Sequence, residues 1–129
     1  MSAPLSKSER NQRIDQSLQS LVSLRGVTTA AVVDADGFVT HIRRDFEVDT
    51  DALGAAVQIV FTAAAKAAGQ VGQGSTKLVL SENKDGLILL APLVRGFVLV
   101  VVADSTAMLG AVRYEVRETI PELDLVFGG

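Results

Sequence analysis

Hydrophobic residues recur at helical spacing over an unusually long stretch near the middle of the chain. No charged residue occurs between Ala52 and Ala65. One apolar stripe along this stretch consists of Leu53, Val57, Val60, Ala64, Ala67 and Val71. A second stripe beside it consists of Ala52, Ala55, Ala56, Ile59 and Ala63. Because a surface helix needs only one such stripe, the second predicts a helix that is covered by protein on two sides or docks on a partner.

Capping residues give the limits of the first and central helices. Ser6 and Glu9 have the spacing of a capping box, and the helix that they begin is expected to close at residues 25–26. Asp49 or Thr50 can cap the central helix, where an acidic group is also favourable. The central helix is expected to end at a group of glycines, Gly69, Gly72 and Gly74.

A third helix is expected near the end of the chain. It should begin near Ser105 or Thr106 and stop at Pro121, because proline disrupts the interior of a helix. The whole chain, residues 1–129, is then one domain, in which we expect residues 1–6 to be a flexible N-terminus and residues 121–129 a C-terminal tail.

Apolar and β-branched runs predict five strands, at residues 27–34, 38–45, 76–82, 86–92 and 96–104. The first two form a hairpin around Asp36 and Gly37. The first, fourth and fifth strands are almost entirely apolar and are placed at the centre of the sheet. The fold class is α/β (α+β), with element order α-β-β-α-β-β-β-α and an antiparallel sheet in strand order 2-1-5-4-3 covered by helices on both faces.

The two expected edge strands differ in how well they are protected. The second strand carries His41, Arg43 and Arg44, and charged side chains are a usual defence of an exposed edge. The third strand carries only Lys77 near its middle. Together with the apolar central helix, this edge offers a self-complementary surface, for which a twofold homodimer is the common solution.

The composition narrows the function classes. The chain has 129 residues, of which 48% are hydrophobic and 5% aromatic, so a single aliphatic core is expected. A net charge of -3 argues against nucleic acid as a partner. The absence of cysteine excludes disulfides and thiolate metal sites and is consistent with a reducing compartment, so a cytoplasmic location is expected.

Two apolar stretches have some features of membrane spans. The central one is rich in alanine, which gains little free energy in lipid, and it contains Gln58, Thr62 and Lys66. The other, residues 87–103, is interrupted by Pro92, Arg95 and Gly96. We therefore expect no membrane insertion, and the N-terminal residues lack the apolar core of a secretory signal.

Motifs that carry chemistry are scarce. His41 is expected to be a solvated side chain of an edge strand, and not a general base or a metal ligand. Residues 34–37 begin like a calcium loop but lack its later ligands, so they are interpreted as a turn. Three side chains are candidates for contact with a partner, because arginine can stabilise phosphoryl transfer in trans: Arg43, Arg44 and Arg95. Ordinary solvated charges on an edge strand and in a turn are the stronger explanation of these arginines. No catalytic residue, cofactor or metal is expected.

The order of these segments resembles the Roadblock or dynein light chain family of small α/β domains. The likeness covers nearly the whole chain and is carried by VTTAAVVDADGFV (27–39), the alanine-rich helix (53–68), GLILLAPLVRGFVLVVVAD (86–104) and MLGAVRYEVRE (108–118). The resemblance implies a profilin-like architecture with the central helix on one face of the sheet. It also implies a dimer through the central helix and the third strand, with the interface expected at Ala52, Ala55, Ala56, Ile59, Ala63, Lys77 and Val79.

Family members act as non-catalytic partners of small Ras-like GTPases, as activating or scaffolding dimers, and in eukaryotes as dynein-associated light chains. The resemblance therefore implies a homodimeric regulator or scaffold of a Ras-like GTPase, similar to the small prokaryotic members, that binds no nucleotide itself. Two alternatives stay open. One is a ligand-sensing module with a small molecule between sheet and helices, and the other is a small hydrolase that uses His41.

Overall fold

The structure, a computed structural model, describes residues 4–129 as three long helices and a five-stranded sheet. The helices are α1 (Lys7–Val22), α2 (Thr50–Gln70) and α3 (Leu109–Gly128). The strands are β1 (Val27–Val33), β2 (Val39–Arg44), β3 (Val79–Asn83), β4 (Gly86–Pro92) and β5 (Val98–Asp104), with a short 3-10 helix, η1 (Val94–Gly96), between the last two. The first half of the predicted flexible N-terminus, residues 1–3, lies outside the described residues.

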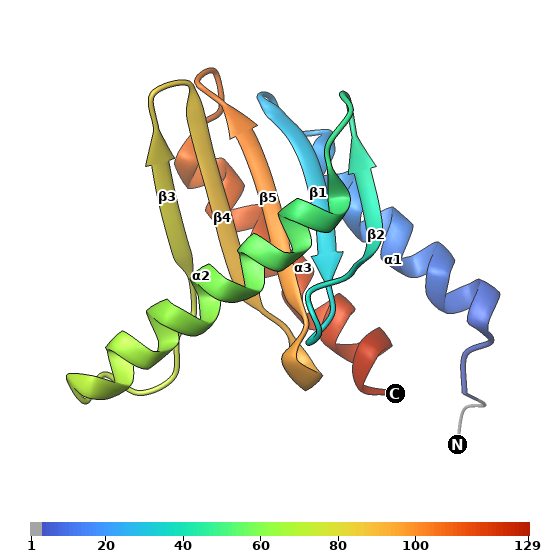
Figure 1. Cartoon of the computed structure of the whole chain (residues 1–129). Coiled ribbons are helices and arrows are strands. Elements are labelled where there is room, and N and C mark those ends of the chain that lie inside the picture. Colours follow the sequence, from blue (N-terminus) through green and yellow to red (C-terminus); the bar gives the residue numbers. More distant parts are fainter. Residues whose placement is uncertain (1–3) are drawn as a thin grey trace.

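All strand pairs are antiparallel, and the strand order is β2-β1-β5-β4-β3. This confirms the predicted fold class and sheet order. Figure 1 shows three layers, with α2 on one face of the sheet and α1 and α3 on the other. β2 and β3 are the two edges, because each has a single neighbour.

The predicted caps of the first two helices are present. The Ser6 hydroxyl accepts a hydrogen bond from the amide of Glu9 (3.1 Å) at the start of α1. A carboxylate oxygen of Asp49 accepts one from the amide of Ala52 (3.1 Å) at the start of α2. Each cap satisfies a backbone donor that has no partner within its helix.

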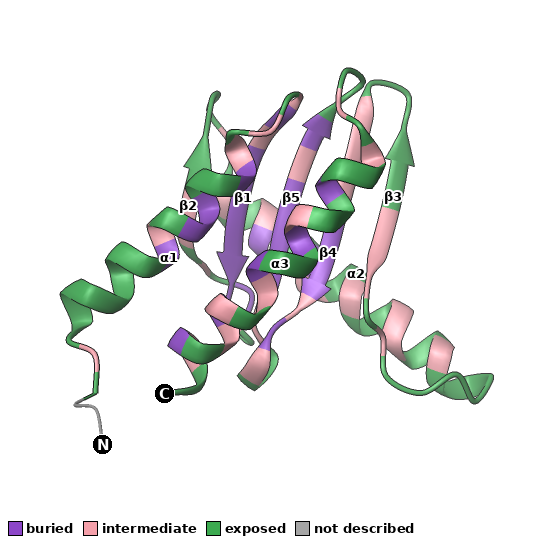
Figure 2. Cartoon of the chain, turned by 180° about the vertical axis from the view of Figure 1, so that it is seen from behind, coloured by how far each residue is buried: buried purple, intermediate pink, exposed green. Residues whose placement is uncertain are grey.

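The sheet separates two apolar cores of unequal size. The larger core lies beneath α1 and α3 and includes Leu18, Leu99 and Leu123, which have no solvent exposure. The smaller one lies beneath α2 and is built around Val57 and Val100. Figure 2 shows the buried positions concentrated in the central strands and on the inner faces of α1 and α3.

The last helix differs from its prediction at both ends. It begins at Leu109, because Asp104 accepts hydrogen bonds from the amide and the hydroxyl of Thr106 and holds the preceding residues in a turn. It also continues through Pro121 to Gly128, so the predicted stop and the predicted tail at residues 121–129 are wrong. The buried side chains of Leu123 and Val126 explain this, since their packing offsets the hydrogen bond that proline removes.

The third strand begins three residues later than predicted. Extending the register of Val79 with Leu90 backwards would place Lys77 opposite Pro92, which has no amide hydrogen for the ladder. Lys77 therefore lies before β3 and not near its middle. The charged residue within β3 is Glu82.

Candidate interaction surface on the central helix

α2 crosses one face of the sheet obliquely. Its N-terminal end lies over β1 and β2, and its C-terminal end extends past the β3 edge (Figure 1). It contacts the sheet mainly through Val57, which is 4% exposed, with Leu53 and Phe61 packed beside it. A helix held by so few side chains has most of its surface on the outside.

Two close approaches fix the rotation of α2 about its own axis. Gly54 lies against the β1–β2 turn, where a Cβ atom would be 2.1 Å from the carbonyl oxygen of Gly37. One turn later, the Gln58 side-chain amide donates to the carbonyl oxygens of Asp34 (2.8 Å) and Gly96 (3.1 Å). Gln58 thus ties α2 to the two loops at one end of the sheet.

The opposite face of α2 is apolar and exposed. All five residues of the second predicted stripe are exposed: Ala52, Ala55, Ala56, Ile59 and Ala63. Ile59 has 70% of its surface exposed, which is high for a large aliphatic residue. This is the pattern expected of a surface that is covered by another protein.

The first predicted stripe is only partly on the sheet. Leu53, Val57 and Ala64 face inward, but Val60 is 46% exposed and Val71 70% exposed, and Ala67 is also exposed. Spacing groups these three residues with Leu53 and Val57, but the structure places them away from the sheet. The helix turns Gly54 and Phe61 toward the sheet instead, because the glycine permits the close approach to Gly37. The exposed apolar face is therefore wider than the sequence predicted, and we refer to it, with Val60 and Ala67 included, as the outer face of α2.

Length and composition alone would also allow α2 to cross a membrane. In the structure this helix lies along the sheet, with Val57 in the smaller core and Gln58 bonded to two loops. A bilayer-spanning arrangement would have to give up these contacts. The absence of membrane insertion stays a prediction.

The β3 edge lies beside the C-terminal half of α2. A hollow between them is lined by Ala64 and Ala68 of the helix and by residues 75–80, which comprise the segment leading into β3 and the first two residues of the strand. Val79 is half-buried at this edge, while Lys77 is exposed in the preceding segment. The outer edge of β3 has no strand partner within the described chain.

The three candidate arginines do not form one site. Arg43 and Arg44 lie at the end of β2, paired with Ala30 and Thr29, whereas Arg95 lies in the β4–β5 connection at the opposite end of the sheet. Arg44 is 3.5 Å from Glu47. Arg95 donates to the carbonyl oxygen of Gly128 (3.3 Å) and has a left-handed backbone, with φ of 60°.

His41 is less solvated than the sequence indicated. Its Nε2 is 3.1 Å from Oδ1 of Asn11, its Nδ1 is 3.0 Å from the hydroxyl of Thr40, and its ring meets that of Phe127 edge-on. Burial beneath α1 lowers the pKa of His41, and the nearby carboxylate of Asp15 opposes that effect. These contacts give His41 a packing role between α1, β2 and α3.

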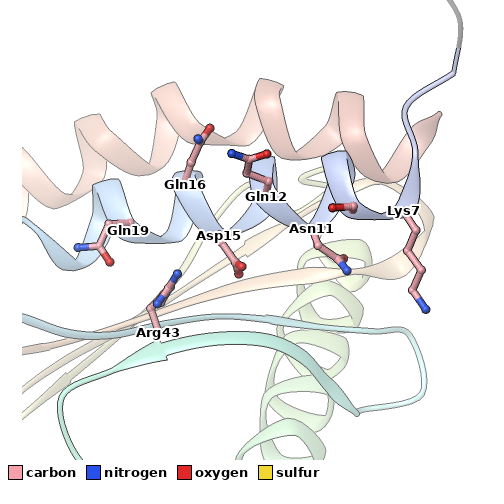
Figure 3. A pocket seen from close by; sticks show the side chains of 8 residues that line it. Lys7, Asn11, Gln12, Asp15, Gln16, Gln19 and Arg43 are labelled. Atoms are coloured by element: carbon pink, nitrogen blue, oxygen red, sulfur yellow. The ribbon is translucent and has the colours of Figure 1, made fainter.

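A polar groove of about 800 Å³ lies between α1 and β2 and is open to solvent. Figure 3 shows Arg43 of β2 on one wall and Asn11, Asp15 and Gln19 of α1 on the other. This groove lies on the face opposite α2. Within residues 4–129, no three His, Asp or Glu side chains gather in a way that could hold a metal ion.

Two contacts of α2 differ in how far the sequence indicates them. Gln58 is an amide within an apolar helix, which is a signal for a specific hydrogen bond. The pairing of Gly54 with Gly37 had no signal in either segment alone, because it depends on how the helix crosses the hairpin.

Comparison with known proteins gives the family. The Roadblock/LC7 domain profile matches residues 13–103. The protein MJ0310 of Methanocaldococcus jannaschii is 28% identical over 114 residues, covering 88% of this chain and 99% of that protein.

Solved structures share the fold at low sequence identity. The gliding protein MglB of Thermus thermophilus superposes with a TM-score of 0.85 at 20% identity, covering 97% of this chain and 95% of that one. A Roadblock/LC7 domain from Streptomyces avermitilis superposes with a TM-score of 0.82 at 20% identity, covering 89% of this chain and 98% of that one. With a profile match over most of its length and the same arrangement of helices and strands, the chain belongs to the Roadblock/LC7 domain family.

Proposed function

We propose that this protein is a non-catalytic, cytoplasmic homodimer that regulates or scaffolds a small Ras-like GTPase. The observation that carries the proposal is the outer face of α2, which leaves Ile59 and Val60 uncovered in a domain of the Roadblock/LC7 family. Exposed apolar area of this kind on a small domain is typical of protein interfaces.

Self-association accounts for the outer face and the β3 edge together. Two copies related by a twofold axis would bury Ala56, Ile59 and Ala63 against the same residues of the partner and would join the two unpaired β3 edges. One solved structure of the similar protein MglB is described as having a tetrameric arrangement, which supports self-association in this fold. The GTPase would then bind the assembled dimer.

The nature of the regulation follows from where the arginines lie. Arg95 is held by Gly128 and Arg44 lies near Glu47, whereas Arg43 has no ion pair within the described residues. Because the three candidate arginines, Arg43, Arg44 and Arg95, do not gather on one surface, we favour a role in positioning the GTPase over donation of one of them to its active site.

The test is a titration of the purified protein with a small Ras-like GTPase encoded near its gene, loaded in turn with GDP and with a non-hydrolysable GTP analogue. Binding to either form supports the proposal, and binding to neither form contradicts it. Single-turnover GTP hydrolysis with Arg43→Ala, Arg44→Ala and Arg95→Ala then separates the two roles. If the protein only positions the GTPase, the rate of GTP hydrolysis should be similar with the wild type and with all three variants.

A further inference from the structure

A second surface of the chain, on the α3 side of the sheet, has an unbalanced positive charge. A hollow of about 490 Å³ lies between α3 and the segment that leads into β3, and its lining includes Lys77, Arg113 and Arg117. Arg113 and Arg117 are one helical turn apart and both are exposed. Within residues 4–129, none of these three cations has a carboxylate within 4.0 Å. We refer to this hollow as the basic hollow.

The other end of β3 carries the opposite charge. Glu82 is the one charged residue within β3, it is exposed, and it has no ion-pair partner among the described residues. It shares a face of the sheet with the basic hollow. Leu80 and Leu87 belong to the core beneath α1 and α3, Leu87 is the register partner of Glu82, and alternate residues of a strand point to the same side.

The proposed dimer brings these two ends together. For the outer faces of two α2 helices to meet, both copies must present α2 on the same side of the joined sheet. A twofold axis perpendicular to the sheet achieves this, and it makes the two β3 strands antiparallel. The C-terminal end of one β3, with Glu82, then lies beside the N-terminal end of the other, where the basic hollow is.

The geometry points to an ionic clasp in which Glu82 of each copy enters the basic hollow of the other and pairs with Arg113 and Arg117. This inference rests on the proposed homodimer and adds a second set of contacts, on the side of the sheet opposite α2. Paired strands lie about 5 Å apart, so Glu82 of one copy would lie close to the sheet edge of the other, on the side that α3 covers. Arg113 and Arg117 line the hollow at that edge, and the planar guanidinium of an arginine can hold a carboxylate through two hydrogen bonds.

The clasp would also specify the partner. Apolar stripes slide and rotate with little loss of contact, whereas a charge pair favours one register of the β3 strands and one orientation of the helices. Because the twofold axis repeats the contact, each dimer has two clasps. The occupant of the basic hollow is therefore a second copy of this chain, and not a free anion or a different protein.

A charge reversal tests the clasp. The variants are Arg117→Glu, Glu82→Arg and the combination of both, and the measurement is the dimer dissociation constant by sedimentation equilibrium at low salt. Each single variant is expected to weaken the dimer roughly tenfold, since it places like charges together twice per dimer. The combined variant is expected to return to within about threefold of the wild type, because it restores opposite charges.

Lys7→Glu, on α1, is the matched control, because it changes the net charge as much as Arg117→Glu does, and it should leave the dimer unchanged. Thermal unfolding should show each variant to be folded. The clasp would be overturned if both single variants had the same dimer dissociation constant as the wild type. It would also be overturned if the combined variant formed a dimer no tighter than that of the weaker single variant. Either result leaves the proposed dimer standing, whereas a monomeric wild type contradicts the dimer and the clasp together.

Discussion

The backbone of Gly54 in α2 lies directly against Gly37 of the β1–β2 turn, so that a Cβ atom on Gly54 would be 2.1 Å from the Gly37 carbonyl oxygen. This contact sets the rotation of α2 on the sheet. It directs Val57 and Phe61 inward and leaves Ile59 outward. The exposed apolar face is thus a consequence of a glycine on the opposite side of the same helix.

Replacing Gly54 by alanine should destabilise the protein by about 1–3 kcal/mol. The added methyl group meets backbone atoms that cannot move aside easily, and the strain exceeds the gain in helix propensity of about 1 kcal/mol. Chemical denaturation measures the change. Gly69→Ala is the matched control, since nothing lies within 4 Å of a Cβ at that helical position. A Gly54→Ala variant as stable as the Gly69→Ala variant would disprove the close contact.

Gln58 connects α2 to the loops at Asp34 and Gly96 through its side-chain amide. Gln58→Glu should lower the free energy of unfolding by about 1–2 kcal/mol, because an ionised carboxylate has no hydrogen to donate to the two carbonyl oxygens. Gln16→Glu, on the exposed side of α1, adds the same charge without breaking such a contact. If Gln58→Glu and Gln16→Glu lost the same free energy of unfolding at pH 7.5, the hydrogen bonds from Gln58 would contribute nothing to stability.

Sequence patterns predicted the order of the elements and their arrangement in the sheet, since these depend on local periodicity and turn residues. They predicted that α2 has two apolar faces, but they did not predict the boundary between the face on the sheet and the exposed face. Val60 fits an inward stripe by spacing alone, yet it is exposed because the packing of Gly54 and Phe61 rotates the helix. Such a rotation is decided by contacts between distant segments, which periodicity does not encode.

The errors at Pro121 and Lys77 have the same origin. Local rules stop a helix at proline, but the buried side chains of Leu123 and Val126 keep α3 helical to its end. Local rules also allow a strand at Lys77, but the register of β3 on β4 brings Pro92 opposite that position. In both places tertiary packing overrides a correct local preference.

His41 should make the stability of the protein depend on pH near neutrality. Burial lowers the pKa of His41 in the folded state below the ordinary value of 6.5. The unfolded chain therefore takes up a proton first as the pH falls, and the folded state loses stability from about pH 7.5 downward until the pH passes the folded-state pKa.

Denaturation of the wild type and of His41→Gln between pH 7.5 and pH 5.5 checks this prediction. The glutamine variant cannot titrate, so its stability should fall less over this range. Parallel curves for the two proteins would show that His41 has the same pKa in the folded and unfolded states.

Two aspartate substitutions on α2 separate folding from assembly. Val57 is 4% exposed beneath the helix, so Val57→Asp buries a charge and should prevent folding, at a cost of about 3 kcal/mol or more. Ile59 is 70% exposed on the outer face, so Ile59→Asp should leave the isolated chain folded. Circular dichroism distinguishes the two, and loss of helical signal in both variants would contradict the assignment of the faces.

Sedimentation equilibrium of the wild type and of Ile59→Asp at the same concentration tests most directly whether the outer face of α2 is an interface. The wild type should sediment with twice the 13.6 kDa mass of the chain, and the folded variant with the mass of a single chain. An exposed substitution elsewhere, Gln16→Asp on α1, should sediment like the wild type. A wild type that is monomeric at tens of micromolar, or an Ile59→Asp variant that remains dimeric, would contradict the account.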